Sequence, residues 1–469
     1  MPEALIVELA TETAVQDVTS PFDHRIVGSI KLTKPDDVAD VLATVRAGAK
    51  ASAALSRNDR GRILDRAAQS IEDRSEIFAR TIVDEAGKTI RQARKEVLRA
   101  VNTLRLSAAE ARRNAGEVIP FDAYEGSEDR HGWFSREPLG IILAITPFND
   151  PLNLVAHKVG PAIAGGNAVV LKPSALTPLS AQLLAETLFD AGLPDTVLTV
   201  VHGGREVARK ILAAPDVRMV SFTGGFSTGE DIARTAGLKK LAMDLGGNAP
   251  VIVMDDADLQ KAVESCVSGA FWAAGQNCVG VQRILVHSSV YQEFKTKFLA
   301  ETAALVVGDP SDGKTDVGPM ITTEAAATLM DKIRLAVDAG AVLLAGGKNF
   351  GNLVQPTVAE AVPEDSRLWQ EEAFGPLVML RPVDSLQEAV DVANSIDFSL
   401  HAGIFTSSIG NAMGAAKQIQ AGGVMINDSS DYRFDGMPFG GFKYGSLGRE
   451  GVRFAYEDMT QPKVICIKN

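Results

Sequence analysis

The chain has 469 residues, of which 46% are hydrophobic, so it is long enough to bury a large core and to divide into two or three domains. Its formal net charge of -12 argues against nucleic acid and against an anionic membrane surface as partners, because both would repel an acidic protein. No run of about 18 apolar residues without charge occurs, so we expect no membrane-spanning helix and a small molecule as the partner.

The cysteines and histidines indicate neither a disulfide framework nor a metal site. Cys266, Cys278 and Cys466 are too few for a framework, and the N-terminus is acidic, without the basic start and apolar core of a secretory signal. We therefore expect a protein of the reducing cytoplasm. The six histidines are scattered, and none is at ligand spacing from another histidine or from a cysteine, so we expect no metal.

The predicted secondary structure changes along the chain. Residues 35–115 are rich in Ala, Arg, Glu and Leu with apolar residues at helical spacing, which predicts amphipathic helices. From residue 140, short apolar runs alternate with Ala-rich helical segments, which predicts a doubly wound α/β fold with a parallel sheet. Between them, the polar residues 118–138 predict an extended arm or hairpin of the kind that oligomers use. A second alternation begins near Leu285 and predicts another α/β unit, with Cys278 near its start.

Cys278 is a lone thiol behind a Gly-Gln turn, in the stretch FWAAGQNCV at 271–279. A thiolate attacks a carbonyl well because sulfur is polarizable and partly ionised near neutral pH, and the thiohemiacetal that it forms with an aldehyde can surrender a hydride. We therefore interpret Cys278 as a candidate nucleophile. A buried, inert cysteine is the alternative, since that is the commonest state of a free cysteine.

Two further features are typical of a nucleotide site at the carboxyl ends of parallel strands. The turn SFTGGFSTG at 221–229 follows an apolar run and precedes a helical segment, so its glycines would let backbone amides approach a pyrophosphate. It does not match the GxGxxG fingerprint, and a plain strand-to-helix turn is the alternative. Lys172 ends another apolar run, where it would reach a cofactor hydroxyl or phosphate unless it is only a surface lysine.

Seven segments fall in one order along nearly the whole chain: TPFNDPLNLVAHK, GPAIAGGNAVVLKPS, SFTGG, MDLGGNAPVIVMDDADL, FWAAGQNCVGVQR, EEAFGPL and MPFGGFKYGSLGREG. Together they resemble the aldehyde dehydrogenase superfamily, and TPFNDPLNLVAHK and GGVMINDSSDYRFDGMPFGG look most like its lactaldehyde, phosphonoacetaldehyde and succinate-semialdehyde branches. The resemblance implies an α/β fold with a Rossmann-type cofactor domain (1–117 and 134–244), an α/β catalytic domain (245–448) and a small oligomerisation arm (118–133 and 449–469) of a homodimer or homotetramer.

The resemblance also assigns the reacting groups. Cys278 becomes the nucleophile, and the Asn149 amide forms the oxyanion hole with the Cys278 backbone N–H; loss of such a donor typically costs about 3 kcal/mol. Asp244 stands where the family usually has the glutamate that activates water to hydrolyse the thioester, and its reach is shorter by about 1.5 Å. Slow hydrolysis, release of the acyl group to CoA, a cofactor-binding protein with weak catalysis, and a non-catalytic Asp244 stay open.

For the cofactor, the resemblance implies a lysine at the adenine ribose, a glycine turn at the pyrophosphate, and a glutamate and a phenylalanine at the nicotinamide end. A solvated glutamate and a core phenylalanine are the alternatives. Ala175 replaces the glutamate with which NAD-preferring members often bind the ribose hydroxyls, so NADP should be accepted at least as well as NAD. The expected residues, in chain order, are Lys172, Ser174, Thr223, Gly224, Gly225, Glu372 and Phe374.

For the substrate, Asn153 and His157 follow Asn149 by four and eight residues, which puts all three on one helical face toward the substrate tunnel. Asp150 would repel an anionic aldehyde unless a cation offsets it, or it caps the following helix. We therefore favour a small hydroxylated or otherwise polar aldehyde over a dicarboxylic semialdehyde, oxidised to the carboxylic acid with NAD or NADP. The expected substrate residues are Asp150, Asn153, His157, the cations Arg105 and Arg433, and Phe439 of the tunnel wall.

Overall fold

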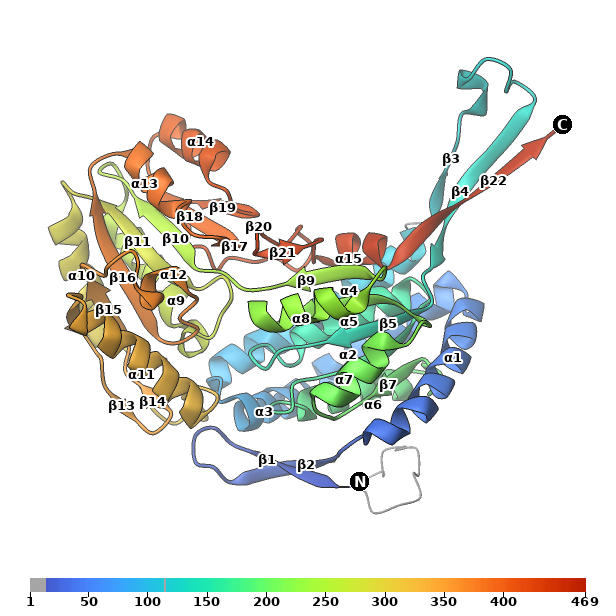
Figure 1. Cartoon of the computed structure of the whole chain (residues 1–469), viewed down its shortest axis with the longest axis horizontal. Coiled ribbons are helices and arrows are strands. Elements are labelled where there is room, and N and C mark those ends of the chain that lie inside the picture. Colours follow the sequence, from blue (N-terminus) through green and yellow to red (C-terminus); the bar gives the residue numbers. More distant parts are fainter. Residues whose placement is uncertain (1–13, 114) are drawn as a thin grey trace.

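The computed structural model describes residues 14–113 and 115–469, in which two sheet-and-helix bodies meet beside a protruding arm (Figure 1). The acidic N-terminal stretch and the first part of the predicted cofactor domain, residues 1–13, lie outside the described residues. The described chain begins with an antiparallel hairpin of β1 (Val15–Thr19) and β2 (Ile26–Lys31), followed by the short helix η1 (Pro35–Asp37).

Six strands form the sheet of the first body, in the order β21-β9-β8-β5-β6-β7. From β5 the chain builds outward through β6 and β7, and it then returns to the other side of β5 for β8 and β9. The boundary between β5 and β8 is therefore a topological switch point, where open parallel sheets bind ligands at the carboxyl ends of their strands. The parallel strands are β5 (Ile141–Ile145), β6 (Ala168–Lys172), β7 (Leu198–Val200), β8 (Val217–Thr223) and β9 (Lys240–Asp244); β21 (Ser446–Leu447) pairs antiparallel with β9.

Helices cover both faces of this sheet, which confirms the doubly wound prediction. Successive residues of β5 alternate between the faces: Ile142 and Ala144 pack among α2 to α6, whereas Ile141 and Leu143 pack against α1, α7 and α8. The helices of this body are α1 (Val38–Ala54), α2 (Arg57–Asp73), α3 (Ser75–Ala86), α4 (Ile90–Arg113), α5 (Asn153–Ala164), α6 (Leu179–Asp190), α7 (Arg205–Ala213) and α8 (Phe226–Ala236).

The second body is a seven-stranded sheet in the order β12-β15-β16-β11-β10-β18-β19, with only β12 antiparallel. Its strands are β10 (Ala249–Val253), β11 (Val281–His287), β12 (Val342–Ala345), β15 (Thr357–Glu360), β16 (Leu377–Val383), β18 (His401–Phe405) and β19 (Gly423–Ile426). Its helices are α9 (Leu259–Phe271), η3 (Trp272–Gly275), α10 (Tyr291–Ala303), α11 (Thr323–Asp338), α12 (Arg367–Gln370), α13 (Leu386–Ala393) and α14 (Ile409–Gln418). Two small ladders pair β13 (Asn349–Phe350) with β14 (Leu353–Val354) and β17 (Phe398–Ser399) with β20 (Phe442–Lys443).

A short connection joins the two sheets end to end. β9 ends at Asp244 and β10 begins at Ala249, so the carboxyl ends of the first sheet face the amino ends of the second (Figure 1). Buried Arg283 fixes this connection: its Nε donates to the Asn248 side-chain oxygen at 2.9 Å and its Nη2 to the Asn248 carbonyl at 3.0 Å. Asn248 in turn donates to the carbonyls of Trp369 and Glu371.

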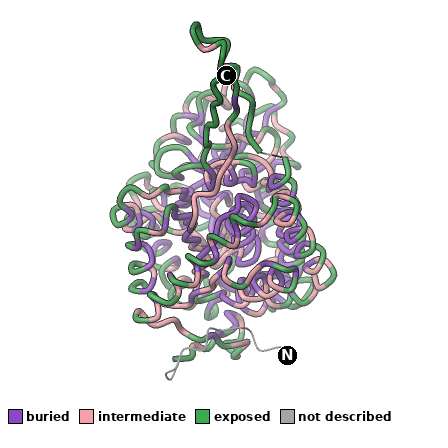
Figure 2. Tube along the Cα trace, turned by 90° about the vertical axis from the view of Figure 1, so that its right-hand side faces the viewer, coloured by how far each residue is buried: buried purple, intermediate pink, exposed green. Residues whose placement is uncertain are grey.

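Three antiparallel strands form the arm, in the order β22-β4-β3, with η2 (Phe121–Ala123) at its loop. They are β3 (Gly116–Val118), β4 (Arg130–Pro138) and β22 (Thr460–Lys468), and Figure 2 shows the protruding end as exposed. The predicted second half of the arm began at residue 449, but α15 (Val452–Asp458) packs on α4 and α5 of the first body. The protruding C-terminal segment therefore starts at β22. None of the helices in the described ranges is long and apolar enough to cross a membrane.

Candidate active site

Cys278 lies where the second body begins to face the first. Between α9 and β11 the chain makes a tight bend in which Ala273 and Ala274 have positive φ values of 50° and 54°, an unfavourable conformation for residues other than glycine. At Gly275 a Cβ would collide with the Gly375 carbonyl oxygen, so only glycine fits. The bend delivers Cys278, half-buried, just before β11, where it packs with Val279, Leu400 and Phe439.

Asn149 reaches the cysteine loop from the other body. It follows β5 at the switch point, and its side-chain nitrogen donates to the Gln276 carbonyl at 3.1 Å. The neighbouring Phe148 contacts Phe374 edge to face, with ring centroids 5.7 Å apart. The structure therefore brings Asn149, Phe374 and the loop before Cys278 together, and the Asn149 amide is a fixed, neutral donor of the kind that stabilises an oxyanion.

Asp244 is a buried carboxyl group without a hydrogen-bond partner on either oxygen. Burial, and next the charge of Glu450, raise the pKa of Asp244 to about 7. Burial, and next the charge of Asp244, also raise the pKa of the Cys278 thiol well above its ordinary value. Asp244 and the thiol therefore share one buried space, and a carboxyl group that titrates near neutrality is suited to accept a proton there.

Glu372 covers the glycines of the connection beside Cys278. Its Oε1 accepts from the Gly247 backbone N–H at 3.2 Å, and a Cβ on Gly246, whose φ is 94°, would lie 2.8 Å from Oε2. A Cβ on Gly247 would lie 2.8 Å from the Cys278 carbonyl oxygen, so Glu372, both glycines and Cys278 meet closely. Burial raises the pKa of Glu372 to about 8, which leaves a carboxyl group able to donate or accept a hydrogen bond.

The strand ends of the first body fit a dinucleotide. Gly225 begins α8 in an extended conformation, and a Cβ placed on it would meet nothing within 4 Å, which leaves room for a phosphate at a helix N-terminus. Lys172, at the end of β6, has no anion partner among the described residues, and burial lowers the pKa of its ammonium group. Ser174 accepts from the Leu176 N–H, whereas the Thr223 hydroxyl donates to Glu450 at 2.9 Å.

Three of the predicted substrate residues, Asp150, Asn153 and His157, belong to a chain of charged and polar side chains, which we call the ion network. Asp150 is bound by Lys88 and by Arg99, and these two cations outweigh burial and lower the pKa of the Asp150 carboxyl. Arg99 also donates to Asp435 at 2.9 Å, and Asp435 contacts His157 Nε2 at 2.9 Å. Asn153 donates to the same Asp435 oxygen at 3.2 Å, so the network fixes Asp150, Asn153 and His157 together. Its members are Lys88, Glu96, Arg99, Asp150, Asn153, His157 and Asp435.

Asp150 does not cap α5. The N–H groups of Leu152 and Asn153, at the start of that helix, donate instead to Glu96 Oε1 of α4 at 2.9 and 3.1 Å. A carboxylate from another helix therefore neutralises this helix end, and it is itself paired with Lys88 at 2.7 Å.

A second group of charges lies between the ion network and the thiol. Arg433 places its guanidinium 3.7 Å from the centre of the Phe439 ring and donates to Glu450 at 3.0 Å, while its Nε is buried without a partner. Glu450 also accepts from Lys158 at 2.9 Å. Although burial acts the other way, Lys158 and Arg433 hold the pKa of Glu450 below its ordinary value.

Arg105 is not brought to the site. It projects from α4 toward α2 and pairs with Glu72 at 2.6 Å on the exposed surface. Arg99, six residues earlier, is the α4 arginine that reaches Asp150. The sequence analysis also missed Lys88, Glu96, Lys158 and Glu450. Lys158 and Glu450 carried a signal, since Lys158 ends the motif TPFNDPLNLVAHK and Glu450 lies in the GREG end of the last motif.

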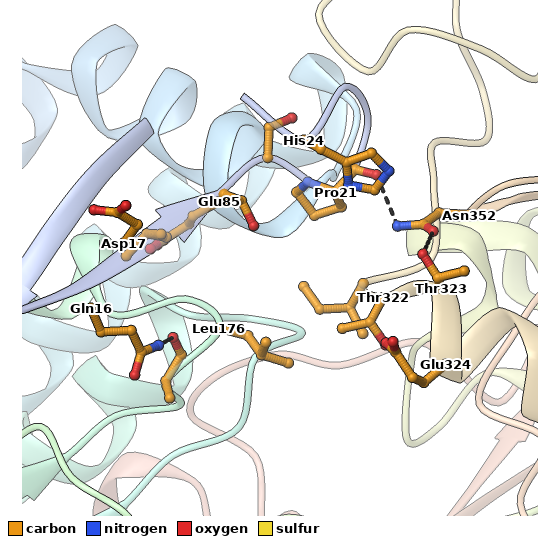
Figure 3. A pocket seen from close by; sticks show the side chains of 15 residues that line it. Gln16, Asp17, Pro21, His24, Glu85, Leu176, Thr322, Thr323, Glu324 and Asn352 are labelled. Atoms are coloured by element: carbon orange, nitrogen blue, oxygen red, sulfur yellow. Dashed lines mark hydrogen bonds between the residues drawn. The ribbon is translucent and has the colours of Figure 1, made fainter. Parts of the chain in front are cut away.

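A separate polar pocket of about 270 Å³ lies between the β1–β2 hairpin, Leu176 and the start of α11 (Figure 3). Asn352 spans it, donating to the Pro21 carbonyl at 2.9 Å and accepting from Thr323 at 2.7 Å. Glu85 accepts from the first N–H groups of α6, and none of the predicted site residues lines this pocket. The residues that line this pocket come from the hairpin and from both bodies.

The profile of the aldehyde dehydrogenase family matches residues 8–465. Aspartate-semialdehyde dehydrogenase 1 of Pseudomonas canavaninivorans is 61% identical over 96% of this chain and 96% of that protein. An aldehyde dehydrogenase of Physcomitrella patens, solved in complex with the reaction product succinate, has a TM-score of 0.95 at 37% identity, covering 98% of this chain and 96% of that one. Glyceraldehyde-3-phosphate dehydrogenase of Methanocaldococcus jannaschii, complexed with NADP, has a TM-score of 0.93 at 40% identity, covering 97% and 99%. The chain belongs to the aldehyde dehydrogenase family.

Membership confirms the predicted fold class and the enzyme class. The protein is an oxidoreductase that oxidises an aldehyde with NAD or NADP, and the bound nicotinamide accepts the hydride.

Asp244→Asn should make the Cys278 thiol more acidic, because it removes a buried negative charge that opposes the thiolate. The expected result is an alkylation rate by iodoacetamide that is several-fold higher at about pH 8, with its pH midpoint moved down. Mass spectrometry would assign the modification to Cys278, and Asp255→Asn is the matched control in the same segment. An unchanged midpoint would show that Asp244 does not act on the thiol.

Proposed function

We propose that this enzyme oxidises a small aldehyde bearing a second, anionic group to the corresponding acid, with Arg433 binding the anion. The observation that carries the proposal is the unpartnered Nε of Arg433, buried beside the wall of the cysteine pocket. Arg433 covers one face of Phe439, and Phe439 packs with Cys278, so a molecule only a few atoms long would reach from the thiol to the guanidinium. A planar guanidinium is well matched to a carboxylate or a sulfonate.

The ion network removes the objection to an anionic substrate. Asp150 alone would repel an anion, which is why the sequence favoured a small hydroxylated or otherwise polar aldehyde over a dicarboxylic semialdehyde. In the structure Lys88 and Arg99 neutralise Asp150, and Arg99 neutralises Asp435. His157 contacts Asp435 through Nε2, and burial, and next the charge of Arg433, lower the pKa of its imidazole. Arg433 keeps an N–H group free to bind an anion, because its Nε has no partner. Its positive charge is also only partly neutralised, because its carboxylate partner Glu450 is shared with Lys158.

Two relatives support the same substrate class. The Pseudomonas canavaninivorans protein is named for an aspartate semialdehyde, and the Physcomitrella patens structure holds succinate. Both names refer to a molecule with a carboxylate a few bonds from the oxidised carbon. A small size also fits the Phe439 side chain, since this aromatic ring packs with Cys278 and occupies space beside the thiol.

The reaction that we propose uses three side chains of this site. Cys278 adds to the aldehyde carbon, and Asn149 and the Cys278 N–H stabilise the oxyanion of the thiohemiacetal. A nicotinamide at the strand ends of the first body would take up the hydride, which would leave a thioester on Cys278. Asp244 then accepts a proton from a water molecule as that water attacks the thioester carbon; the C–S bond breaks, the carboxylic acid leaves and the Cys278 thiolate is restored. The free thiols Cys266, Cys278 and Cys466 fit a reducing cytoplasm, which we propose as its location.

A stopped-flow burst of reduced nicotinamide tests this route, with succinate semialdehyde as substrate. Because Asp244 has a pKa of about 7, the steady rate should rise with pH, about tenfold per unit below pH 7, while added CoA has no effect. Asp244→Asn should keep the burst and lower the steady rate by about 100-fold or more. Turnover that requires CoA would place the enzyme in the acylating class, and the absence of a burst with any aldehyde would leave only a cofactor-binding protein with weak catalysis.

Arg433→Met tests the substrate class. Loss of a charge-assisted hydrogen bond costs about 1.5–3 kcal/mol, so kcat/KM for succinate semialdehyde should fall about 10–100-fold. Neutral lactaldehyde in the same variant should change much less, and Arg433→Lys should restore part of the difference. The ratio of the two substrates removes any general effect on Glu450. Equal losses for both aldehydes would contradict a role of Arg433 in binding the anion.

We propose that the arm joins copies of this chain into a homodimer or homotetramer. β22 is a nine-residue edge strand, and Val118, Val464 and Ile467 are 83%, 58% and 49% exposed. An exposed edge with apolar side chains is a template for pairing. Sedimentation velocity should show an oligomer for the native chain and smaller species for Ile467→Glu, with Lys463→Glu as the control. A monomeric native chain would overturn the proposal.

A further inference from the structure

Two side chains that can carry positive charge leave neighbouring strands at the same edge of the first sheet. β6 and β7 are parallel, with Leu171 opposite Val200, and the Val201 N–H donates to the Leu171 carbonyl at 2.8 Å. Lys172 is the last residue of β6, and His202 follows the end of β7 by two residues. Both are held at the carboxyl ends of strands, where this kind of sheet binds nucleotides.

Neither side chain has a partner that satisfies it. Lys172 Nζ makes no hydrogen bond or ion pair within residues 14–113 and 115–469. His202 Nδ1 is buried and has no hydrogen-bond partner, while the His202 backbone is fixed by Thr33 on both its N–H and its carbonyl. Buried polar groups are ordinarily paired, so the space beside Lys172 and His202 lacks an acceptor for these two side chains.

Among the charged groups near His202, Lys172 is the one whose charge shifts the pKa of the imidazole. Burial, and next the Lys172 charge, lower the pKa of His202 to about 4, so its imidazole is neutral near pH 7. Most charged groups on the surrounding elements have partners of their own. Lys210 pairs with Asp36 and Glu206, Arg205 and Arg209 pair with Asp231, Arg46 pairs with Asp216, and Asp37 accepts from the Lys34 N–H. The remaining charged groups of α1 and α6 are Asp40, Lys50, Glu186 and Asp190.

A dianion is the ligand that would supply the missing acceptor to both Lys172 and His202. The next turn of chain offers no carboxylate, because Ala175 stands there and uses its carbonyl to accept from Gln16. Lys172 supplies one positive charge, and a phosphate beside it would reverse the electrostatic balance at His202 and favour the imidazolium. A ribose diol, which has no charge, would leave His202 neutral.

We propose that His202 is a specificity-determining residue of the cofactor site: it pairs with Lys172 to bind the ribose phosphate of NADP and takes up one proton from solvent as that phosphate binds. No covalent bond changes, and the proton is released when NADP leaves. NAD binds the same site without moving the proton. The preference for NADP over NAD therefore depends on pH, strongest at lower pH.

The sign of this dependence follows from linkage. Bound to phosphate, His202 holds its proton to a higher pH than in the free enzyme, so the added NADP affinity is present below that bound value and is lost as pH rises through it. The ribose phosphate loses its last proton near about pH 6, so it stays dianionic above about pH 6.5. Between about pH 6.5 and 8.5 the Kd of NADP should weaken by up to about tenfold per unit, while that of NAD stays level.

Isothermal titration calorimetry of the full chain with NADP and with NAD, in non-phosphate buffers of different ionisation enthalpy, counts the protons directly. NADP should take up between about half a proton and one proton at about pH 7, and NAD none. In His202→Gln the uptake with NADP should disappear, and NADP should bind about tenfold more weakly at about pH 6.5 but unchanged at about pH 8.5.

Two controls separate this role from a structural one. An unchanged Kd for NAD shows that His202→Gln is folded, and Lys172→Met should weaken NADP at every pH while keeping the proton uptake. Equal uptake for both cofactors, or uptake that persists in His202→Gln, would overturn the proposal. No aldehyde is present, so the result does not depend on the proposed substrate class.

Discussion

The short connection between β9 and β10 constrains the rest of this structure. Because only residues 245–248 separate two strands that belong to different sheets, the ends of the sheets must abut. Each sheet then contributes what its end can offer: the first presents strand ends and helix N-termini that bind phosphates, and the second presents the bend before β11 that carries the thiol. Arg283 and Asn248 fasten this joint to the second body with hydrogen bonds, so the position of one sheet end against the other is fixed close to the site.

Charge burial explains why so many ionised groups lie behind a site whose chemistry needs few of them. An unpaired buried charge costs several kcal/mol, and a paired one contributes little net stability, so the ion network is not there for stability alone. Its use is geometric: Lys88, just before α4, and Glu96 and Arg99 of α4 fix the start of α5 and the loop that carries Asn149. A helix that never touches the thiol thus sets where the oxyanion donor stands.

Sequence reasoning succeeded where chemistry is concentrated in local motifs. The doubly wound sheet followed from periodicity, and the proximity of Asn149, Asp244 and Cys278 followed from ordered motifs that the structure brings to one place. It could not identify Lys88 or Arg99, because Lys88 lies just before α4 and Arg99 lies on it, among many other basic residues. Both pair with Asp150, which is more than 50 positions away. Arg105 shows the same limit: it lies six residues after Arg99, so it projects about 120° away from Arg99 around the helix axis, and only packing decides which of these directions is buried.

The C-terminal segment has a consequence for synthesis of the protein. β21 completes the edge of the first sheet by pairing with β9, α15 packs on α4 and α5, and β22 pairs with β4. The first body is therefore left without its last strand and one covering helix until the ribosome has made residues 446–458. During translation about 200 residues of the second body emerge while the first still shows an open edge and an uncovered apolar face, the kind of surface on which chaperones act.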